Sequence, residues 1–125
     1  MAIQSKPRAI AILDDDESVR IAIQGLIKEF GLPTVVFASA EEFLCSNEGL
    51  HAACLIADIR LPGMSGLELQ SKLNLDRCKI PIIFITAHGD ERMRMQAIRN
   101  GAVEFLTKPF DDEALLDRVR AALDS

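Results

Sequence analysis

Four short apolar segments of this sequence are each followed by side chains of types that do chemistry together. Asp14 and Asp15 follow the first of these segments, and Asp58 follows another. Thr86 and Lys108 follow two later ones. Each feature alone has an ordinary explanation, such as a solvated helix start, a turn or a surface lysine. Together, carboxylates, a hydroxyl and an ammonium at four segment ends indicate a chemical site.

Carboxylates that meet at one place repel one another, and a divalent cation relieves that repulsion. Oxygen ligands favour a hard ion such as Mg²⁺, with Mn²⁺ as a substitute, and Mg²⁺ in turn favours phosphate oxygens. A phosphoryl group is therefore the expected partner of the ion. Lys108 would neutralise one phosphoryl oxygen, and Thr86 would donate a hydrogen bond to another. One carboxylate would be the nucleophile and would form an aspartyl phosphate.

The apolar segments that must position these side chains are typical of β-strands. Three are apolar at nearly every position, as parallel strands covered on both faces are, and the second and fifth suit the edges of a sheet. Since the carboxyl ends of parallel strands lie on one rim, the polar residues that follow them should converge. The expected strands are residues 9–13, 34–37, 53–57, 82–85 and 103–106.

Between these segments the sequence has helical periodicity and signals for helix starts. Ser39 with Glu42, and Ser65 with Glu68, match the S-x-x-E pattern of a capping box, and Asp90 can cap a later helix. Five helices that alternate with five strands predict an α/β domain of three layers. Right-handed crossovers make this a doubly wound parallel sheet.

The composition excludes several classes of protein. The 125 residues have a net charge of −5 and include neither Trp nor Tyr, which argues against direct contact with nucleic acid. Apolar runs of about six residues are too short to span a membrane, and residues 1–8 lack the apolar core of a signal peptide. The three cysteines have no C-x-x-C spacing and are expected to be reduced thiols in a cytoplasmic protein. We expect an N-terminal extension at residues 1–8 and a single domain at residues 9–123.

From Ala9 to Leu123, the sequence resembles the receiver domain of two-component response regulators. The motifs that carry the resemblance are Ile12–Asp16, Asp58–Gly66, Ile85–Ala87 and Lys108–Phe110, in the order of that family. Residues 85–90 and 101–110 further resemble the nitrogen-fixation type of regulator, in which a LuxR-like helix-turn-helix output domain follows the receiver. The resemblance implies a flavodoxin-like fold with strand order 2-1-3-4-5, and a phosphoacceptor rather than an enzyme.

The resemblance also assigns roles at the site. Asp58 would accept the phosphoryl group from a phosphohistidine of a sensor histidine kinase. Asp14 and Asp15 would hold Mg²⁺, Asp15 directly and Asp14 largely through water. Asp58 and the backbone carbonyl of Arg60 would complete the protein ligands, and no organic cofactor is expected.

A switch follows from the same resemblance. Lys108 would pair with the phosphoryl group, and its bond to Pro109 would be cis. Thr86 would turn toward a phosphoryl oxygen, and Phe105 would swing inward into the space that is vacated. Phe105 stands where many relatives have Tyr, so the switch would lack that hydroxyl. The movement would alter the face made by the fourth helix, the fifth strand and the fifth helix.

The lifetime of the phosphoryl group depends, in this family, on two further positions. Arg60 lies two residues past Asp58, and His88 lies two residues past Thr86. Either side chain could orient or block the attacking water, and the sequence does not say which. For His88, an exposed loop histidine with no such role is the ordinary alternative.

The expected output of the switch is a change of partner at that face. Candidate contact residues are Met93, Met95, Ile98 and Val103, although burial in the core is the ordinary alternative for each. Phosphorylation would make the chain form a homodimer, or dock onto its own output domain or another regulator. The DNA-binding half would lie outside this chain, either because a longer chain has been shortened, which we favour, or because the receiver stands alone.

Three other functions fit parts of the pattern. A haloacid-dehalogenase-type phosphatase would make Asp14 the Mg²⁺-dependent nucleophile, but the sequence lacks its Gly-Thr continuation and a cap domain. A flavin carrier would need a phosphate loop where the carboxylates stand. A pseudo-receiver that acts only through protein contacts would not need the intact set of site residues. The sequence has no Walker A loop and no G-x-G-x-x-G motif, and nothing in it indicates a Ser-His-Asp triad.

Overall fold

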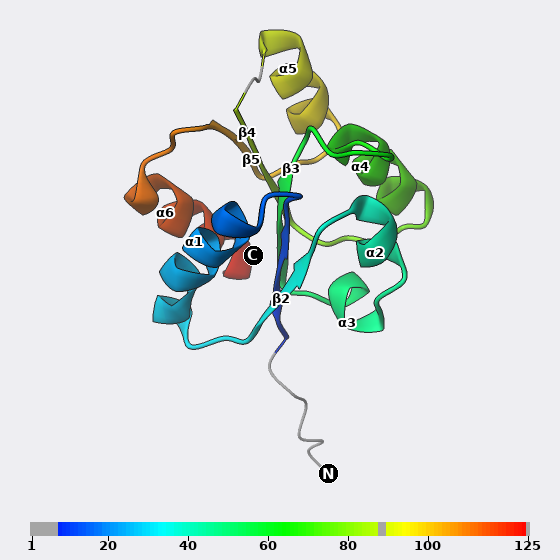
Figure 1. Cartoon of the computed structure of the whole chain (residues 1–125). Coiled ribbons are helices and arrows are strands. Elements are labelled where there is room, and N and C mark those ends of the chain that lie inside the picture. The colour runs from blue at the N-terminus through cyan, green and yellow to red at the C-terminus, as the bar shows by residue number, and fades with distance from the viewer. Residues whose placement is uncertain (1–7, 88–89, 125) are drawn as a thin grey trace.

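A five-stranded sheet with helices on both faces forms the part of the chain that the structure describes (Figure 1). The structure is a computed structural model that describes residues 8–87 and 90–124. The strands are β1 (Ile10–Leu13), β2 (Thr34–Phe37), β3 (Cys54–Asp58), β4 (Ile82–Thr86) and β5 (Glu104–Thr107). The α-helices are α1 (Glu17–Ile27), α2 (Ala40–Leu44), α3 (Asn47–Leu50), α4 (Gly66–Leu75), α5 (Glu91–Arg99) and α6 (Asp112–Leu123). Within the described residues, no helix combines the length and the apolar character needed to cross a membrane.

The strands lie in the order β2-β1-β3-β4-β5, and each neighbouring pair is parallel. The predicted fold class and strand order are therefore confirmed, with β2 and β5 at the edges. Every residue of β1, β3 and β4 is buried, whereas β2 and β5 contain partly exposed residues. The continuous apolar runs of the central strands follow from this position, because helices cover both of their faces.

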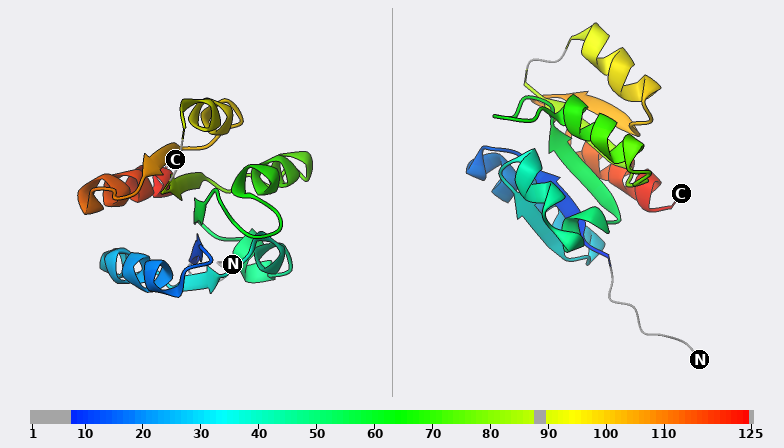
Figure 2. Two further views of the ribbon diagram at one scale, coloured as in Figure 1. Left: turned by 45° about the horizontal axis from the view of Figure 1, so that its top comes forward. Right: turned by 90° about the vertical axis from the view of Figure 1, so that its right-hand side faces the viewer.

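Alternate residues of the central strands enter two separate cores, one on each face of the sheet. Helices α1 and α6 cover one face, and α2 to α5 cover the other (Figures 1 and 2). Ile23 of α1 and Leu115 of α6 belong to the first core. Phe43 of α2, Leu69 of α4 and Phe84 of β4 belong to the second. The sheet is thereby fixed from both sides, and its carboxyl edge remains for polar residues.

The segment between β2 and β3 differs from the prediction, because it contains two short helices rather than one. Six α-helices thus stand, within the described residues, where five were predicted. Ser46 starts the second of the two, and its Oγ accepts the N–H of Gly49 at 3.0 Å. Gly49 packs so closely that a Cβ there would lie 2.9 Å from the Phe37 ring. The chain therefore turns at Ser46 and brings its backbone against the aromatic core.

The two predicted capping boxes have different outcomes. Ser65 and Glu68 make both reciprocal bonds at the start of α4. Ser39 also caps its helix by accepting the N–H of Glu42. Glu42, however, accepts the N–H of Ala38 at 3.0 Å instead of reaching back to Ser39. The start of α2 is therefore stabilised by a cap that lacks the predicted reciprocal bond.

Candidate functional site

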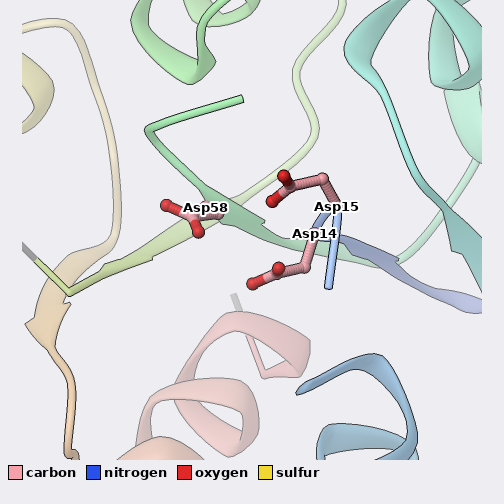
Figure 3. Close-up of side chains that lie close together, drawn as sticks. All are labelled: Asp14, Asp15 and Asp58. Carbon is pink, nitrogen blue, oxygen red and sulfur yellow. The ribbon is translucent and has the colours of Figure 1, made fainter. Parts of the chain in front are cut away.

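The register of the sheet brings together carboxylates from the ends of β1 and β3. Leu13 pairs with Ala57, so the residues that follow them, Asp14 and Asp58, stand level at the carboxyl edge. Asp15 comes next in the chain. One carboxylate oxygen from each of the three aspartates lies within 4.8 Å of the others, and Figure 3 shows these side chains at the strand ends. The structure thus assembles the acidic part of the predicted site.

Two of the three carboxylates are buried, and backbone N–H groups hold them. Asp14 is 1% exposed and Asp58 is 7% exposed, whereas Asp15 is open to solvent. Asp14 Oδ1 accepts the N–H of Asp16 at 2.9 Å, and Asp58 Oδ1 accepts the N–H of Arg60 at 3.0 Å. Each buried carboxylate is therefore oriented through its Oδ1 by the loop that follows its own strand.

Lys108 supplies a positive charge to both buried carboxylates. Its Nζ lies 3.1 Å from Asp14 Oδ2 and 3.3 Å from Asp58 Oδ2. Its backbone N–H donates to the carbonyl of Thr86 at 2.8 Å, which ties the ends of β4 and β5 together. The peptide bond between Lys108 and Pro109 is cis. The four motifs of the sequence thus meet at one edge of the sheet.

The charges at this edge do not balance. Burial raises the pKa of Asp14, and the charge of Asp58 adds to the rise, although the N–H of Asp16 and the Lys108 ammonium oppose it. Burial by itself would lower the pKa of Lys108, but bonds and charge contacts with Asp14 and Asp58 outweigh burial and raise it. Three carboxylates beside one ammonium make the cluster negative. All of its candidate ligand atoms are oxygens, so the cluster fits a hard divalent cation.

The two predicted switch residues lie on neighbouring strands beside the site. Thr86 is the last residue of β4, is fully buried and stands level with Thr107 of β5. Phe105 is level with Phe84 and packs in the core that α2 to α5 cover. The structure therefore shows the Phe105 ring inside the core, and the movement of the two side chains stays a prediction.

Of the two positions predicted to tune the phosphoryl lifetime, the structure describes only Arg60. His88 lies outside the described residues. Arg60 is exposed, and its backbone N–H orients Asp58. Metal ligation by the Arg60 carbonyl and an effect of its side chain on lifetime stay predictions.

Comparison with known protein families agrees with this geometry. Residues 10–120 match the family described as the response regulator receiver domain. The chain belongs to this family. The resemblance inferred from four short motifs therefore extends over nearly all of the receiver domain.

Relatives of this receiver domain include regulators of the nitrogen-fixation type. Nodulation protein W of Bradyrhizobium diazoefficiens is 47% identical over 113 residues, which are 90% of this chain and 50% of that protein. Transcriptional regulatory protein FixJ of Azorhizobium caulinodans is 40% identical over 114 residues, which are 91% of this chain and 54% of that protein. The solved structure of response regulator StyR has a TM-score of 0.84 and 44% identity, and the match covers 96% of this chain and 60% of that one. The chain spans about half the length of the two curated relatives.

The predicted output face of the receiver domain is made by α5, β5 and α6. Met95 is 50% exposed, and Ile98 and Val103 are each 37% exposed. Met93 is partly buried and packs against the core. Three of the four candidate contact residues therefore expose apolar surface that core packing does not use.

A groove of about 630 Å³ lies beside the exposed carboxylate of the receiver domain. It lies next to Asp15 and runs along the loop after β3 toward α5. The other residues that line it are Ile59, Arg60, Leu61, Pro62, Ser65, Leu67 and Met93. The acidic cluster is thus reached from solvent along a mainly apolar wall.

Two contacts of the receiver site were not predicted from the sequence. Arg20 of α1 donates from Nη1 to the backbone carbonyl of Asp14 at 2.7 Å. Glu41 of α2 accepts the N–H of Met64, in the loop after β3, at 3.0 Å. The position of Arg20 in the helix that directly follows the acidic cluster was a usable signal. The 23 residues that separate Glu41 from Met64 left no local pattern to find.

Proposed function

We propose that this receiver domain accepts a phosphoryl group on Asp58 from a phosphohistidine of a sensor histidine kinase in the cytoplasm. The observation that carries the proposal is that Asp58 lies beside the Lys108 ammonium and close to the carboxylates of Asp14 and Asp15. Its Oδ1 is held by the N–H of Arg60, and its Oδ2 lies beside Lys108. A carboxylate fixed in this way is suited to nucleophilic attack, and the ammonium is placed to stabilise the product.

In the proposed transfer, a carboxylate oxygen of Asp58 bonds to phosphorus while the P–N bond of the phosphohistidine breaks. The imidazole leaves with the electron pair of that bond and takes up a proton. The product is an acyl phosphate, which carries roughly −1.5 to −2 charges in place of the single negative charge of the Asp58 carboxylate, so the edge becomes more negative than before. Lys108 would neutralise a phosphoryl oxygen. The domain would in this way assist its own phosphorylation and dephosphorylation, as a phosphoacceptor and not as an enzyme with a separate substrate.

Asp14, Asp15 and Asp58 are the residues that would hold Mg²⁺, together with the backbone carbonyl of Arg60. One carboxylate oxygen from each of the three aspartates lies within 4.8 Å of the others, which supports their part of this assignment. When bound, the ion supplies positive charge that offsets the carboxylates and the phosphoryl oxygens. Mn²⁺ has the same preference for oxygen ligands and would serve as a substitute.

Thr86 and Phe105 form the proposed switch. The hydroxyl of Thr86 would turn toward a phosphoryl oxygen, and Phe105 would repack with it. Because packed cores change between discrete arrangements, this movement would shift the face of α5, β5 and α6 between two states. The exposed apolar surface of Met95 and Ile98 supports that face as a contact surface.

Two outputs fit this switch. Since a transcriptional regulatory protein is among the relatives, we propose that phosphorylation controls dimerisation and a DNA-binding output domain. A stand-alone receiver that acts through protein contacts alone is the second candidate, and the exposed apolar face supports it equally. Self-association that depends on phosphorylation would favour the first.

The test uses acetyl phosphate and Mg²⁺ with mass spectrometry of the intact protein and its peptides. The wild type should gain one phosphoryl group at Asp58, and Asp58→Asn should gain none while it remains folded. Incorporation by Asp58→Asn at the wild-type level would refute the assignment, and an adduct at Asp14 would indicate a phosphatase. Hydrodynamic mass with beryllofluoride and Mg²⁺ then measures dimerisation, and a mass that stays monomeric would count against the dimeric output.

A further inference from the structure

The loop that leads from Asp58 to α4, residues 59–65, is held near its end by a side chain from another element. The N–H of Met64 donates to Glu41 Oε2 of α2 at 3.0 Å. At the start of the same loop, the N–H of Arg60 donates to Asp58 Oδ1. A contact from α2 therefore acts on the segment that orients the phosphoacceptor.

The backbone of this loop is shaped to receive a carboxylate. Gly63 has a φ of +75°, a conformation that glycine adopts without the strain that a side chain would bring. A Cβ at Gly63 would lie 2.7 Å from Glu41 Oε2. The side chain of Met64 is partly buried and packs against the core. Glycine thus permits the turn and leaves the space in which the carboxylate meets the loop.

Helix α2 is a firm support for Glu41. Ser39 caps this five-residue helix, and Ala40 and Phe43 on its inner side are fully buried. The Phe43 ring stands edge-on to the Phe37 ring, with 5.4 Å between the ring centres. Glu41 itself lies at the surface, and its carboxylate reaches the loop rather than the core.

We propose that Glu41 is a positioning residue for the phosphorylation site. By holding Met64, it keeps the loop in the conformation in which the backbone of Arg60 orients Asp58. The inference rests on the proposed function, because its effect is on the rate of phosphoryl transfer. The N–H of Met64, and second the N–H of Glu41 itself, lower the pKa of Glu41, so the carboxylate is ionised when it makes this contact.

The test compares Glu41→Ala and Glu41→Gln with Glu42→Ala as a matched control. Glu42 is the next residue of the same turn and has the same charge, but its carboxylate accepts the N–H of Ala38. Three quantities are measured for each protein at a fixed Mg²⁺ concentration. They are the initial rate of phosphate incorporation from acetyl phosphate, the hydrogen exchange rate of the Met64 amide by NMR, and the free energy of unfolding in urea.

Glu41→Ala should speed exchange of the Met64 amide about fivefold, which corresponds to the loss of roughly one hydrogen bond, and should slow incorporation about threefold. Glu41→Gln keeps an oxygen acceptor, so both rates should return to within about twofold of the wild type. Glu42→Ala removes the same charge and should leave both rates within about twofold of the wild type, whatever its effect on stability.

Two results would overturn the inference. The first is a wild-type incorporation rate in Glu41→Ala despite faster Met64 exchange, since the contact would then hold the loop without serving the site. The second is equal slowing in Glu42→Ala, which would assign the effect to charge or stability. Absence of any incorporation by the wild type would instead refute the proposed function, so the two failures are distinguishable.

Discussion

On the two faces of the sheet the deeply buried strand side chains are apolar, whereas at its carboxyl edge the chain buries Asp14, Asp58 and Thr86. On the faces, residues such as Phe84 and Leu115 are closed off by packing against helices. At the edge, two buried carboxylates share one ammonium, and the third faces solvent. The apolar residues of the two faces are covered by helices, whereas the carboxylates at the edge outnumber the ammonium beside them.

The two faces of the sheet account for the stability of the domain, and its carboxyl edge accounts for the proposed function. Burial of apolar surface stabilises the two faces. Burial of carboxylates at the edge opposes folding unless a cation compensates them. The same arrangement makes the stability of the edge depend on a divalent ion or a phosphoryl group. Either one changes the net charge of the acidic cluster, which packing of the faces does not affect. Changes on the faces and changes at the edge should therefore have different consequences.

Phe84→Ala should have the largest effect on stability, because it removes a buried ring from one face. Phe84 is 1% exposed, and truncation of such a residue removes about 3–5 kcal/mol from the free energy of unfolding. Asp58→Asn, the matched change at the edge, should stay within about 1 kcal/mol of the wild type. Urea unfolding followed by circular dichroism measures both. An equally large loss for Asp58→Asn would erase the distinction between the two regions.

Lys108→Ala should have the next largest effect, because it removes the ammonium between two buried carboxylates. In metal-free protein the expected loss is about 2 kcal/mol, less than for a fully buried pair because the Lys108 side chain is 22% exposed. Lys79→Ala removes an exposed lysine before β4, at the other end of the sheet, and should change stability by less than about 0.5 kcal/mol. Urea unfolding of the two variants gives the comparison.

The same variant also tests the proposed role of Lys108 in switching. Lys108→Ala should still accept some phosphate, since Asp58 remains, but it should not dimerise in response. Phosphate incorporation and hydrodynamic mass are measured on one sample. Dimerisation at the wild-type level after phosphorylation would contradict the role given to the ammonium.

The central strands were predictable because their sequence pattern and their position have the same cause. β3 and β4 are apolar along nearly their whole length, since helices cover both faces, and the aspartate and threonine at their ends then had to lie at the carboxyl edge. The acidic cluster therefore followed from the strand assignment together with the parallel order of the sheet.

What the sequence did not predict depends on contacts between distant residues or on a competing local signal. The bond from Met64 to Glu41 joins residues 23 positions apart, and this separation gives no local pattern. The division of the second helical segment had a signal in Ser46, which is a good N-cap, but it lay too close to the cap at Ser39 to be separated from it.

Mg²⁺ should stabilise the edge by an intermediate amount. A ligand that binds only the folded state adds about 1.4 kcal/mol to the free energy of unfolding at ten times its Kd. Asp15→Asn is the informative control, because Asp15 is exposed and should matter little without the metal. The variant should therefore unfold like the wild type in EDTA and gain less from Mg²⁺. Equal gains for the two proteins would remove Asp15 from the ligand set.

The smallest expected effect distinguishes two aspartates of one loop whose pKa values move in opposite directions. Burial raises the pKa of Asp14 above its ordinary 3.8, whereas hydrogen bonds from Ser18 lower the pKa of Asp16. A raised pKa means that the folded state binds the proton more tightly than the unfolded chain. The stability of metal-free protein should therefore fall as pH rises through the folded pKa of Asp14.

Asp14→Asn removes this penalty and should be more stable than the wild type by about 1 kcal/mol near neutral pH in EDTA. The difference should shrink as pH falls through the raised pKa of Asp14 toward 3.8, because the wild-type carboxyl then becomes neutral as well. Subtracting the two proteins cancels the opposite contribution of Asp16, which both retain. Urea unfolding from about pH 7 to about pH 4 measures the difference. A variant less stable than the wild type at neutral pH would mean that Asp14, paired with Lys108, stabilises the edge as packing stabilises the faces.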